Sequence, residues 1–151
     1  MHNQDDTLPA SGDGLADALS TTAFVVMASI NRIAAEHDLS LSLLRVLGIL
    51  SDRRPRMSEL ADYLGLEKQT MSGLIARAEK RGLVARAPNA DDKRATDVFL
   101  TQEGTRLITR LRGEGQAALT PLIEGLAPPD QQLLEVLLLR LVNNRRKPRN
   151  S

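Results

Sequence analysis

The run of local signals over residues 58–104 constrains the fold more than any other part of the chain. Apolar residues recur there at helical spacing in two short blocks, and Gly65 separates the blocks. In order, the segment predicts a helix ending before Gly65, a second helix over 68–81, a strand over 83–87, a polar loop over 88–95, a strand over 96–100 and a helix start at Thr101. This order predicts a winged helix-turn-helix.

Amphipathic helices are predicted on both sides of this core. Apolar residues recur every three or four positions over residues 15–36, and two further apolar helices are predicted between residues 101 and 142. Ser40 is expected to cap a helix over 41–51, and Pro128–Pro129 is expected to break the chain before a last helix over 130–142. That last helix is apolar nearly all round, which a monomer of this size could hardly bury, so we expect a homodimer.

The fold class is therefore mainly α with a small β-hairpin wing. We expect these parts: a flexible N-terminal tail over 1–14, a helical dimerisation region over 15–36 and 101–142, a winged helix-turn-helix DNA-binding domain over 40–100, and a basic C-terminal tail over 143–151.

Composition excludes several classes of protein. The chain has no Cys, so it has no disulfide framework, thiolate metal site or cysteine redox sensor. We expect no apolar run long enough to span a bilayer, and the acidic N-terminus does not read as a signal peptide. A cytoplasmic location follows as the default expectation.

Charge is unevenly distributed although the formal net charge is only +1. Residues 67–94 carry seven basic and four acidic side chains, a local charge of +3, whereas the first eighteen residues carry four acids and no Lys or Arg. Local charge sets the field that DNA phosphates experience. Taken alone, this pattern is equally compatible with an ordinary solvated surface.

The second helix of the pair is the candidate recognition helix, because it would face the major groove. Met71, Leu74, Ile75 and Ala78 share one face and are expected to be buried. The candidate DNA-binding residues on the other face and in the first turn are Lys68, Gln69, Thr70, Ser72, Gly73, Arg77 and Lys80. Gln can read adenine, Ser can contact base or phosphate, and Arg and Lys neutralise phosphate.

The polar loop over 88–95 is the candidate wing. Arg94 on a projecting hairpin is the kind of side chain that a narrow minor groove attracts, with Lys93 beside it. Asp92, two residues earlier, is expected to hold the Arg94 guanidinium in place. A simple solvated turn remains the alternative reading.

No catalytic constellation is visible, so an enzyme is not expected. The two histidines, His2 and His37, are far apart, and His37 near a helix end is interpreted as a capping or packing residue. The chain has no Gly-rich phosphate loop, nucleophile elbow or Cys/His metal spacing, and no cofactor is expected.

Over roughly residues 15–142 the chain resembles the MarR family of bacterial transcription regulators. The resemblance rests on SELADYLGL, on TMSGLIARAEKRGLVAR, and on Asp92-Lys93-Arg94 followed by LTQEG. It implies a homodimer that binds a pseudo-palindromic operator in double-stranded DNA, and small aromatic or anionic effectors. By position it assigns Gln69, Thr70, Ser72 and Arg77 to the recognition helix, Ser58 to the preceding helix near phosphate, and Asp92 and Arg94 to the wing.

The chain departs from the family pattern at three positions. Gly73 stands where many relatives carry Arg, and Glu67 and Arg56 stand where Ser, Thr or Asp usually cap the two helices. The absence of Cys excludes the thiol-oxidation branch of the family, and the scarcity of His argues against the metal-sensing branch.

The principal hypothesis is a homodimeric, ligand-responsive DNA-binding regulator, most simply a repressor. One alternative is a winged-helix module that binds proteins and not DNA, and another is a constitutive DNA-binding regulator without an effector. An effector site is predicted where the helices over 15–36, 41–51 and 101–112 meet. Its candidate lining residues are Met27, Ile30, Asn31, Arg45, Leu47 and Arg106, of which either arginine could pair with a carboxylate.

Overall fold

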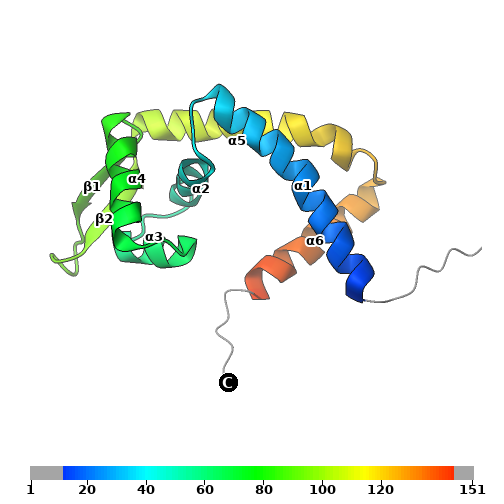
Figure 1. The fold of residues 1–151 in the computed structure, drawn as a ribbon, viewed down its shortest axis with the longest axis horizontal. Helices are drawn as coiled ribbons and strands as arrows, with labels where there is room; N and C mark the ends of the chain where they lie inside the picture. Colours follow the sequence, from blue (N-terminus) through cyan, green and yellow to red (C-terminus); the bar gives the residue numbers. More distant parts are fainter. Residues whose placement is uncertain (1–11, 145–151) are drawn as a thin grey trace, which may run out of the picture. The chain divides into compact units, whose positions relative to one another are not determined.

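The computed structural model describes residues 12–144 and confirms the predicted fold class (Figure 1). The elements are α1 (Gly12–Glu36), α2 (Leu41–Leu50), α3 (Met57–Leu64), α4 (Lys68–Lys80), β1 (Val84–Pro88), β2 (Thr96–Leu100), α5 (Gln102–Ile123) and α6 (Pro128–Asn144). The chain divides into two compact units after Gly115, within α5. The expected tails fall mostly outside the described residues: 1–11 of the first and 145–151 of the second.

The first two helices follow the sequence signals closely. Helix α1 begins at Gly12, three residues before the expected start, and ends at Glu36 as expected. Ser40 caps α2 as predicted, because its hydroxyl oxygen accepts a hydrogen bond from the Leu43 backbone N–H at 3.1 Å. Leu43, Val46, Leu47 and Leu50 of α2 are all buried, so this helix supplies the centre of the core.

The helix-turn-helix forms around a left-handed glycine. Gly65 has φ 66°, and its backbone N–H closes the last turn of α3, as expected for a glycine that terminates a helix. Arg56 and Glu67 make no side-chain capping bond, in agreement with the poor N-caps expected for α3 and α4. The predicted buried face of α4 is confirmed for Met71, Leu74, Ile75 and Ala78.

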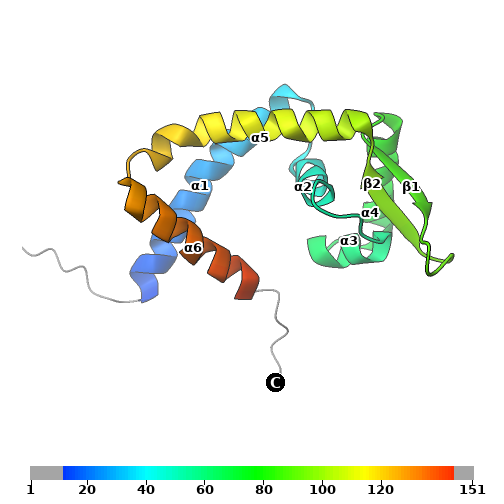
Figure 2. The same cartoon turned by 180° about the vertical axis from the view of Figure 1, so that it is seen from behind.

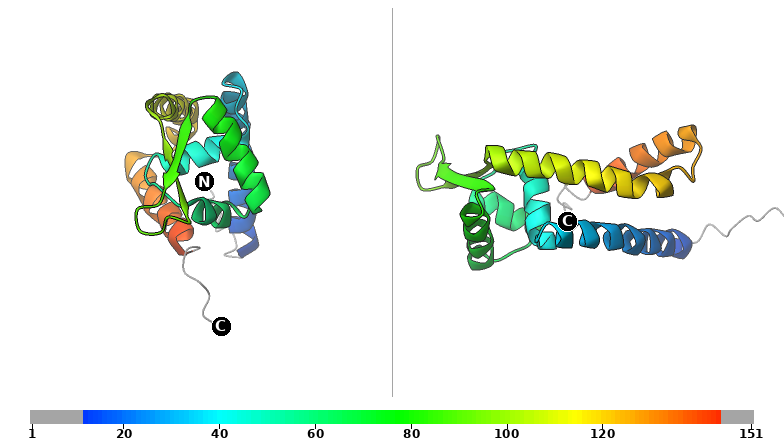
Figure 3. Two further views of the ribbon diagram at one scale, coloured as in Figure 1. Left: turned by 90° about the vertical axis from the view of Figure 1, so that its left-hand side faces the viewer. Right: turned by 90° about the horizontal axis from the view of Figure 1, so that it is seen from above.

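A two-stranded antiparallel hairpin follows α4, and its loop projects beyond the helices of the core (Figures 1 and 3). The register pairs Arg86 with Val98, and Val98 is fully buried. Strand β1 begins one residue later than predicted, because the Leu83 backbone N–H still bonds to the Ala78 carbonyl at 3.0 Å to close α4. An ion pair of 2.7 Å between Arg86 and Glu79 ties β1 to α4.

Helix α5 starts against the hairpin through Thr101. The Thr101 hydroxyl caps the Gly104 backbone N–H at 3.1 Å, and the Thr101 backbone N–H bonds to the Leu83 carbonyl at 3.1 Å. A Cβ atom on Gly104 would lie 2.0 Å from the Leu83 carbonyl oxygen. The Leu-Thr-x-x-Gly motif therefore has a steric cause: only glycine lets the first turn of α5 approach the end of α4 and the start of β1 this closely.

The second unit contains the end of α5 and α6. Helix α6 begins at Pro128, two residues earlier than expected, because proline is tolerated in the first turn of a helix where no intrahelical N–H is needed. None of its residues is buried. Its exposed large apolar residues are Leu133, Leu134, Val136, Leu137, Leu138, Leu139, Leu141 and Val142. This exposure agrees with the expectation that one chain cannot bury the helix.

Helix α1 corrects one expectation. By length and composition alone, Asp13–Glu36 is long and apolar enough to cross a membrane, with a mean hydropathy of 1.3, although no such run was expected. The reason is that Ser and Thr, rather than charged residues, separate its apolar positions, so its hydropathy stays high. Leu15, Leu19, Phe24 and Val25 of α1 are exposed. A helix that is buried only on association passes the same test.

Candidate nucleic-acid interface

The outward face of α4 is polar. None of its exposed positions after the N-cap residue Glu67 carries an acidic side chain. Burial of Met71, Leu74, Ile75 and Ala78 turns the opposite face toward solvent. Of the candidate DNA-binding residues on this helix, all are exposed except the half-buried Gly73: Lys68, Gln69, Thr70, Ser72, Arg77 and Lys80. The three basic side chains form no ion pair within the described part of the chain, so their charge remains available to phosphate.

Gly73 lies beside the side chain of Arg77. A Cβ atom on Gly73 would lie 3.7 Å from Arg77 Nη1, an ordinary van der Waals distance, so the helix itself does not require glycine here. The small residue leaves the neighbouring guanidinium uncovered on this side. Arg77 is exposed and is the cation that this part of the helix face presents.

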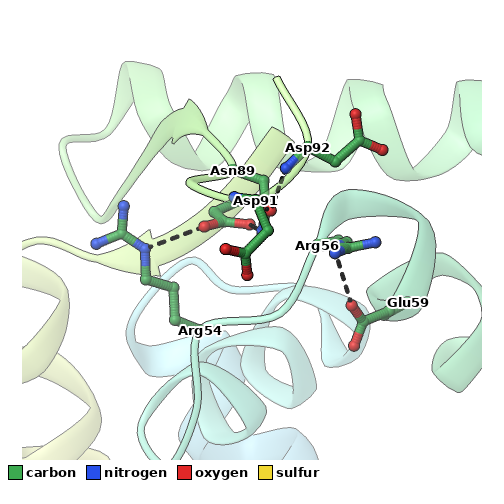
Figure 4. Close-up of polar contacts among 7 residues, drawn as sticks. Arg54, Arg56, Glu59, Asn89, Asp91 and Asp92 are labelled. Atoms are coloured by element: carbon green, nitrogen blue, oxygen red, sulfur yellow. Dashed lines mark hydrogen bonds and ion pairs between the residues drawn. The ribbon is translucent and has the colours of Figure 1, made fainter. Parts of the chain in front are cut away.

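The tip of the wing is built by the side chain of Asn89 (Figure 4). Its Oδ1 accepts hydrogen bonds from the backbone N–H groups of Asp91 and Asp92, both at 3.0 Å. The Asp92 carboxylate in turn accepts the Arg94 backbone N–H at 3.0 Å. These bonds replace the inter-strand ladder at the tip and give the loop a defined shape.

The role expected for Asp92 therefore changes. We expected its carboxylate to hold the Arg94 guanidinium, but it binds the Arg94 backbone, and no ion pair joins the two side chains in this fully described loop. The physical reason is local: the short Asp side chain reaches the N–H two residues on and closes a turn. The Arg94 side chain is exposed and forms no ion pair with any residue between 12 and 144.

Recognition helix and wing meet at a hollow of about 410 Å³. It is lined by Met57, Ser58, Ala61, Lys68, Ser72, Asp92, Arg94, Ala95 and Thr96. Five of the predicted DNA-binding residues thus come together from three elements: Ser58 of α3, Lys68 and Ser72 of α4, and Asp92 and Arg94 of the wing. The other six do not line the hollow: Gln69, Thr70, Gly73, Arg77 and Lys80 lie along α4, and Lys93 lies in the wing loop.

Sequence reasoning missed the residues that support the wing from below. Asp97 of β2 is only 9% exposed, accepts a hydrogen bond from Asn89 Nδ2 at 2.8 Å, and has a carboxylate oxygen 3.6 Å from Arg54 Nε. Arg54 also lies over the Phe99 ring, 4.0 Å from its centroid. The only sequence signal for this support was an acidic residue inside a predicted strand together with an Asn in the adjacent turn.

The loop between α2 and α3 explains why Asp97 is buried. The Val98 backbone N–H bonds to the Pro55 carbonyl at 3.0 Å, and Arg56 forms an isolated antiparallel bridge with Asp97. This segment covers β2 on the edge away from β1. Alternation along the strand could not reveal it, because the covering residues come from a distant part of the sequence.

The residues predicted to line an effector site differ in how deeply they are buried and in what they contact. Leu47 is fully buried, Met27 and Ile30 are half-buried, and Asn31 is exposed. Arg45 lies over the Tyr63 ring, 5.8 Å from its centroid, and Arg106 pairs with Glu103 at 3.7 Å. None of the six lines the hollow at the wing.

His37 lies just beyond the end of α1, where its Nε2 is 2.7 Å from a carboxylate oxygen of Glu114 on α5. This contact fits the expected packing role. Arg81, at the end of α4, donates hydrogen bonds to the carbonyls of Asp38 at 2.7 Å and His37 at 3.1 Å. The turn after α1 is thus linked to both α4 and α5. His2 lies outside the described residues, and residues 12–144 contain no group of side chains suited to a metal ion.

Comparison with known proteins gives a consistent result. A sequence model of the MarR family matches residues 37–95. The transcriptional regulator HosA of Escherichia coli O157:H7 is 31% identical over 98 residues, which cover 58% of this chain and 73% of HosA. These relatives are transcription regulators, not enzymes.

Solved structures share the fold over most of the chain. A MarR family protein from Bacillus stearothermophilus superposes with a TM-score of 0.79 at 21% identity, covering 89% of this chain and 95% of that one. The structure of NadR in complex with 4-hydroxyphenylacetate has a TM-score of 0.68 at 25% identity, covering 93% and 97%. With this fold, this wing and these relatives, the chain belongs to the MarR family of winged helix-turn-helix transcription regulators.

Proposed function

We propose that the protein is a homodimeric repressor that binds a pseudo-palindromic operator in double-stranded DNA in the cytoplasm and is released by a small aromatic or anionic effector. The observation that carries DNA binding is the hollow of about 410 Å³ at which Lys68 and Ser72 of α4 face Arg94 of the wing. A helix in the major groove and a hairpin in the adjacent minor groove need this juxtaposition.

In this proposal the two elements have different tasks. Gln69 and Ser72 face base edges, whereas Ser58, Lys68, Arg77 and Lys80 contact phosphates. Arg94 enters the minor groove, where its guanidinium is free because Asp92 binds the backbone instead. Lys93 adds charge at the wing. Phosphate contacts fix the position of the protein, and base contacts select the sequence.

Dimerisation follows from the apolar surface that one chain leaves exposed. Leu134, Leu137, Leu138 and Leu141 of α6 are each 42–51% exposed, and four apolar residues of α1 are 40–78% exposed: Leu15, Leu19, Phe24 and Val25. Large exposed apolar residues in such numbers are normally covered by a partner. In this proposal the partner is a second copy of the chain, because the two-fold symmetry of a homodimer matches the two-fold symmetry of a pseudo-palindromic operator.

The experiment is operator selection followed by titration. Fragments are selected from random double-stranded DNA, and the affinity for the selected site is measured by fluorescence anisotropy over a salt series. We expect the logarithm of affinity to fall linearly with that of salt concentration. Arg94→Ala should weaken binding by about 1–3 kcal/mol. Arg110→Ala is the matched control, because Arg110 is an exposed α5 residue remote from the wing.

Two results would count against the proposal. Failure to enrich any sequence would favour a protein-binding module, and equal affinity of the Arg94→Ala and Arg110→Ala variants would remove the wing from the interface. Sedimentation equilibrium of the parent protein tests the dimer separately.

A further inference from the structure

The tip of the wing is held by a hydrogen bond to a buried acid in β2. Residues 89–95 connect β1 to β2 at the end of the hairpin that lies away from α5 (Figure 2). The backbone bonds of this loop stay within it: the Asn89 N–H donates to the Ala95 carbonyl at 2.9 Å, and the Ala95 N–H donates to the Asp92 carbonyl at 3.0 Å. Among residues 12–144, the hydrogen bond from Asn89 Nδ2 to Asp97 is the one side-chain bond between the loop and a strand.

The loop itself determines the direction of this bond. Asn89 Oδ1 accepts the backbone N–H groups of Asp91 and Asp92, both at 3.0 Å, so the oxygen end of the amide faces the loop. The Nδ2 end then faces β2, where a donor needs an acceptor. Asp97 Oδ1 is that acceptor, at 2.8 Å. An apolar side chain at position 97 would therefore remove the connection between the loop and the strand.

The stability of β2 does not explain why an acid stands at position 97. Asp97 is only 9% exposed, and a buried carboxylate costs free energy unless it is paired. Its second oxygen lies 3.6 Å from Arg54 Nε, and the Arg54 guanidinium carbon lies 4.0 Å from the centroid of the Phe99 ring. Replacing such a buried ion pair by apolar side chains is often neutral or stabilising. The acid is better explained by the loop that it holds.

A continuous path of bonds leads from this acid to the cation of the wing. Asn89 binds the Asp92 N–H, and the Asp92 carboxylate binds the Arg94 N–H at 3.0 Å. This last bond acts on the backbone of Arg94 and so fixes the direction in which its side chain leaves the loop. The minor groove of B-DNA is only about 6 Å wide, so the direction decides whether the side chain can enter it.

We propose that Asp97 is a positioning residue for minor-groove recognition. Through Asn89 it holds the wing in the shape that directs Arg94 into a narrow, A·T-rich minor groove at the outer edge of each half-site. A narrow groove attracts arginine because its negative potential is stronger. Asp97 acts without contacting DNA, since it is buried in β2. The inference rests on the proposed function and adds to it the residue that gives the wing its selectivity.

The test compares two operators that share the selected half-sites and differ only at the outer edges, which carry either A·T or G·C pairs. The ratio of the two affinities, measured by fluorescence anisotropy with the full-length protein, reports minor-groove selectivity. We expect a ratio of about tenfold for the parent and of about one for Asp97→Leu. Asp97→Leu should keep or raise the urea midpoint of the parent, because an apolar side chain suits a buried strand position. Loss of selectivity without loss of stability distinguishes positioning from a structural role.

A reciprocal exchange tests the hydrogen bond itself, and it decides the question even if Asp97→Leu does not fold. Asn89→Asp places two carboxylates against each other and should lower the selectivity as Asp97→Leu does. Asp97→Asn keeps an acceptor oxygen and should retain the parent's selectivity. The double variant Asn89→Asp/Asp97→Asn exchanges donor and acceptor, so its selectivity should return to that of the parent.

Asp91→Asn is the matched control for charge. It removes one negative charge from the same loop, but Asp91 takes part in the loop through its backbone N–H, and its carboxylate forms no hydrogen bond or ion pair among residues 12–144. This variant should keep the parent's selectivity. A loss of selectivity in Asp91→Asn as large as that in Asp97→Leu would show that the charge of the wing, and not the bond to Asn89, sets the selectivity.

Three other results would overturn the inference. If Asp97→Leu keeps the parent's ratio, or if the double variant is no more selective than Asn89→Asp, the role of Asp97 is lost while the proposed function stands. If the parent binds both operators equally, the inference fails together with the assignment of the wing to the minor groove.

Discussion

Gly104→Ala should lower the stability of the winged core more than the addition of a single methyl group anywhere else in α5. The added Cβ would lie 2.0 Å from the Leu83 carbonyl oxygen, 3.0 Å from the Leu83 carbonyl carbon and 3.1 Å from Leu100 Cδ2. Two of these three atoms belong to the backbone, so no side-chain rotation relieves the overlap. Helix α5 or the start of β1 must move.

The cost can be estimated from the contacts that such a movement disrupts. Overpacking a core position costs about 1–3 kcal/mol. Moving α5 away from Leu83 also weakens the bond between the Thr101 N–H and the Leu83 carbonyl, about 1 kcal/mol. Loss of the Thr101 cap on Gly104 adds about 1 kcal/mol. We therefore expect a loss of about 3–5 kcal/mol, equivalent to a fall in Tm of about 6–20 °C for a domain of this size.

Urea unfolding followed by circular dichroism measures this loss, at one fixed protein concentration because a dimer's stability depends on it. Gly113→Ala is the control: it adds the same methyl group to the same helix, but no atom lies within 4 Å of the new Cβ. That variant should gain about 0.5–1 kcal/mol from improved helix propensity. Equal midpoints for the two variants would refute the steric explanation of the motif.

Three further results are expected. Gly73→Ala should be tolerated and stabilise α4 by about 0.5–1 kcal/mol in urea unfolding, because its Cβ only touches Arg77; a strong loss would indicate a close contact absent from this structure. Arg81→Ala should lower the free energy of unfolding by about 1–3 kcal/mol, since it leaves two carbonyls of the turn after α1 without their hydrogen-bond donor. An unchanged urea midpoint would show that these two hydrogen bonds do not contribute to stability. Deleting residues 128–151 should give an aggregated product by light scattering, and a stable soluble monomer would contradict the dimer.

Elements set by local chemistry were predictable from the sequence. Gly65 ended α3 and Ser40 capped α2 as expected, because each signal acts through bonds within a few residues. The apolar period of α4 placed Met71 and Ile75 in the core for the same reason. Element ends were less accurate, as at Pro128, where one residue can either break a helix or begin one.

Features that depend on distant contacts could not be predicted. The burial of Asp97 requires the segment before α3 to cover β2, and nothing in the strand itself indicates this. Asp92 was correctly placed in the wing, but its predicted partner was wrong. Both the guanidinium and the backbone N–H of Arg94 are possible partners for this short side chain, and the carboxylate binds the N–H. The predicted effector residues came from three helices, α1, α2 and α5, but none of them lines the hollow formed by Leu50, Phe99, Ile108 and Arg112, whose residues come from elements far apart in the sequence.

The central claim is that α4 and the wing read adjacent grooves of one DNA duplex. Hydroxyl-radical and methylation footprinting of the selected operator test it together, with the parent protein and Arg94→Ala at saturating concentration. We predict two protected half-sites about 10–10.5 base pairs apart, or a multiple of that spacing, in the parent complex. In Arg94→Ala, minor-groove protection at the outer edges should disappear while major-groove protection remains. Unchanged minor-groove protection in that variant, or a single unsymmetrical protected site, would contradict the account.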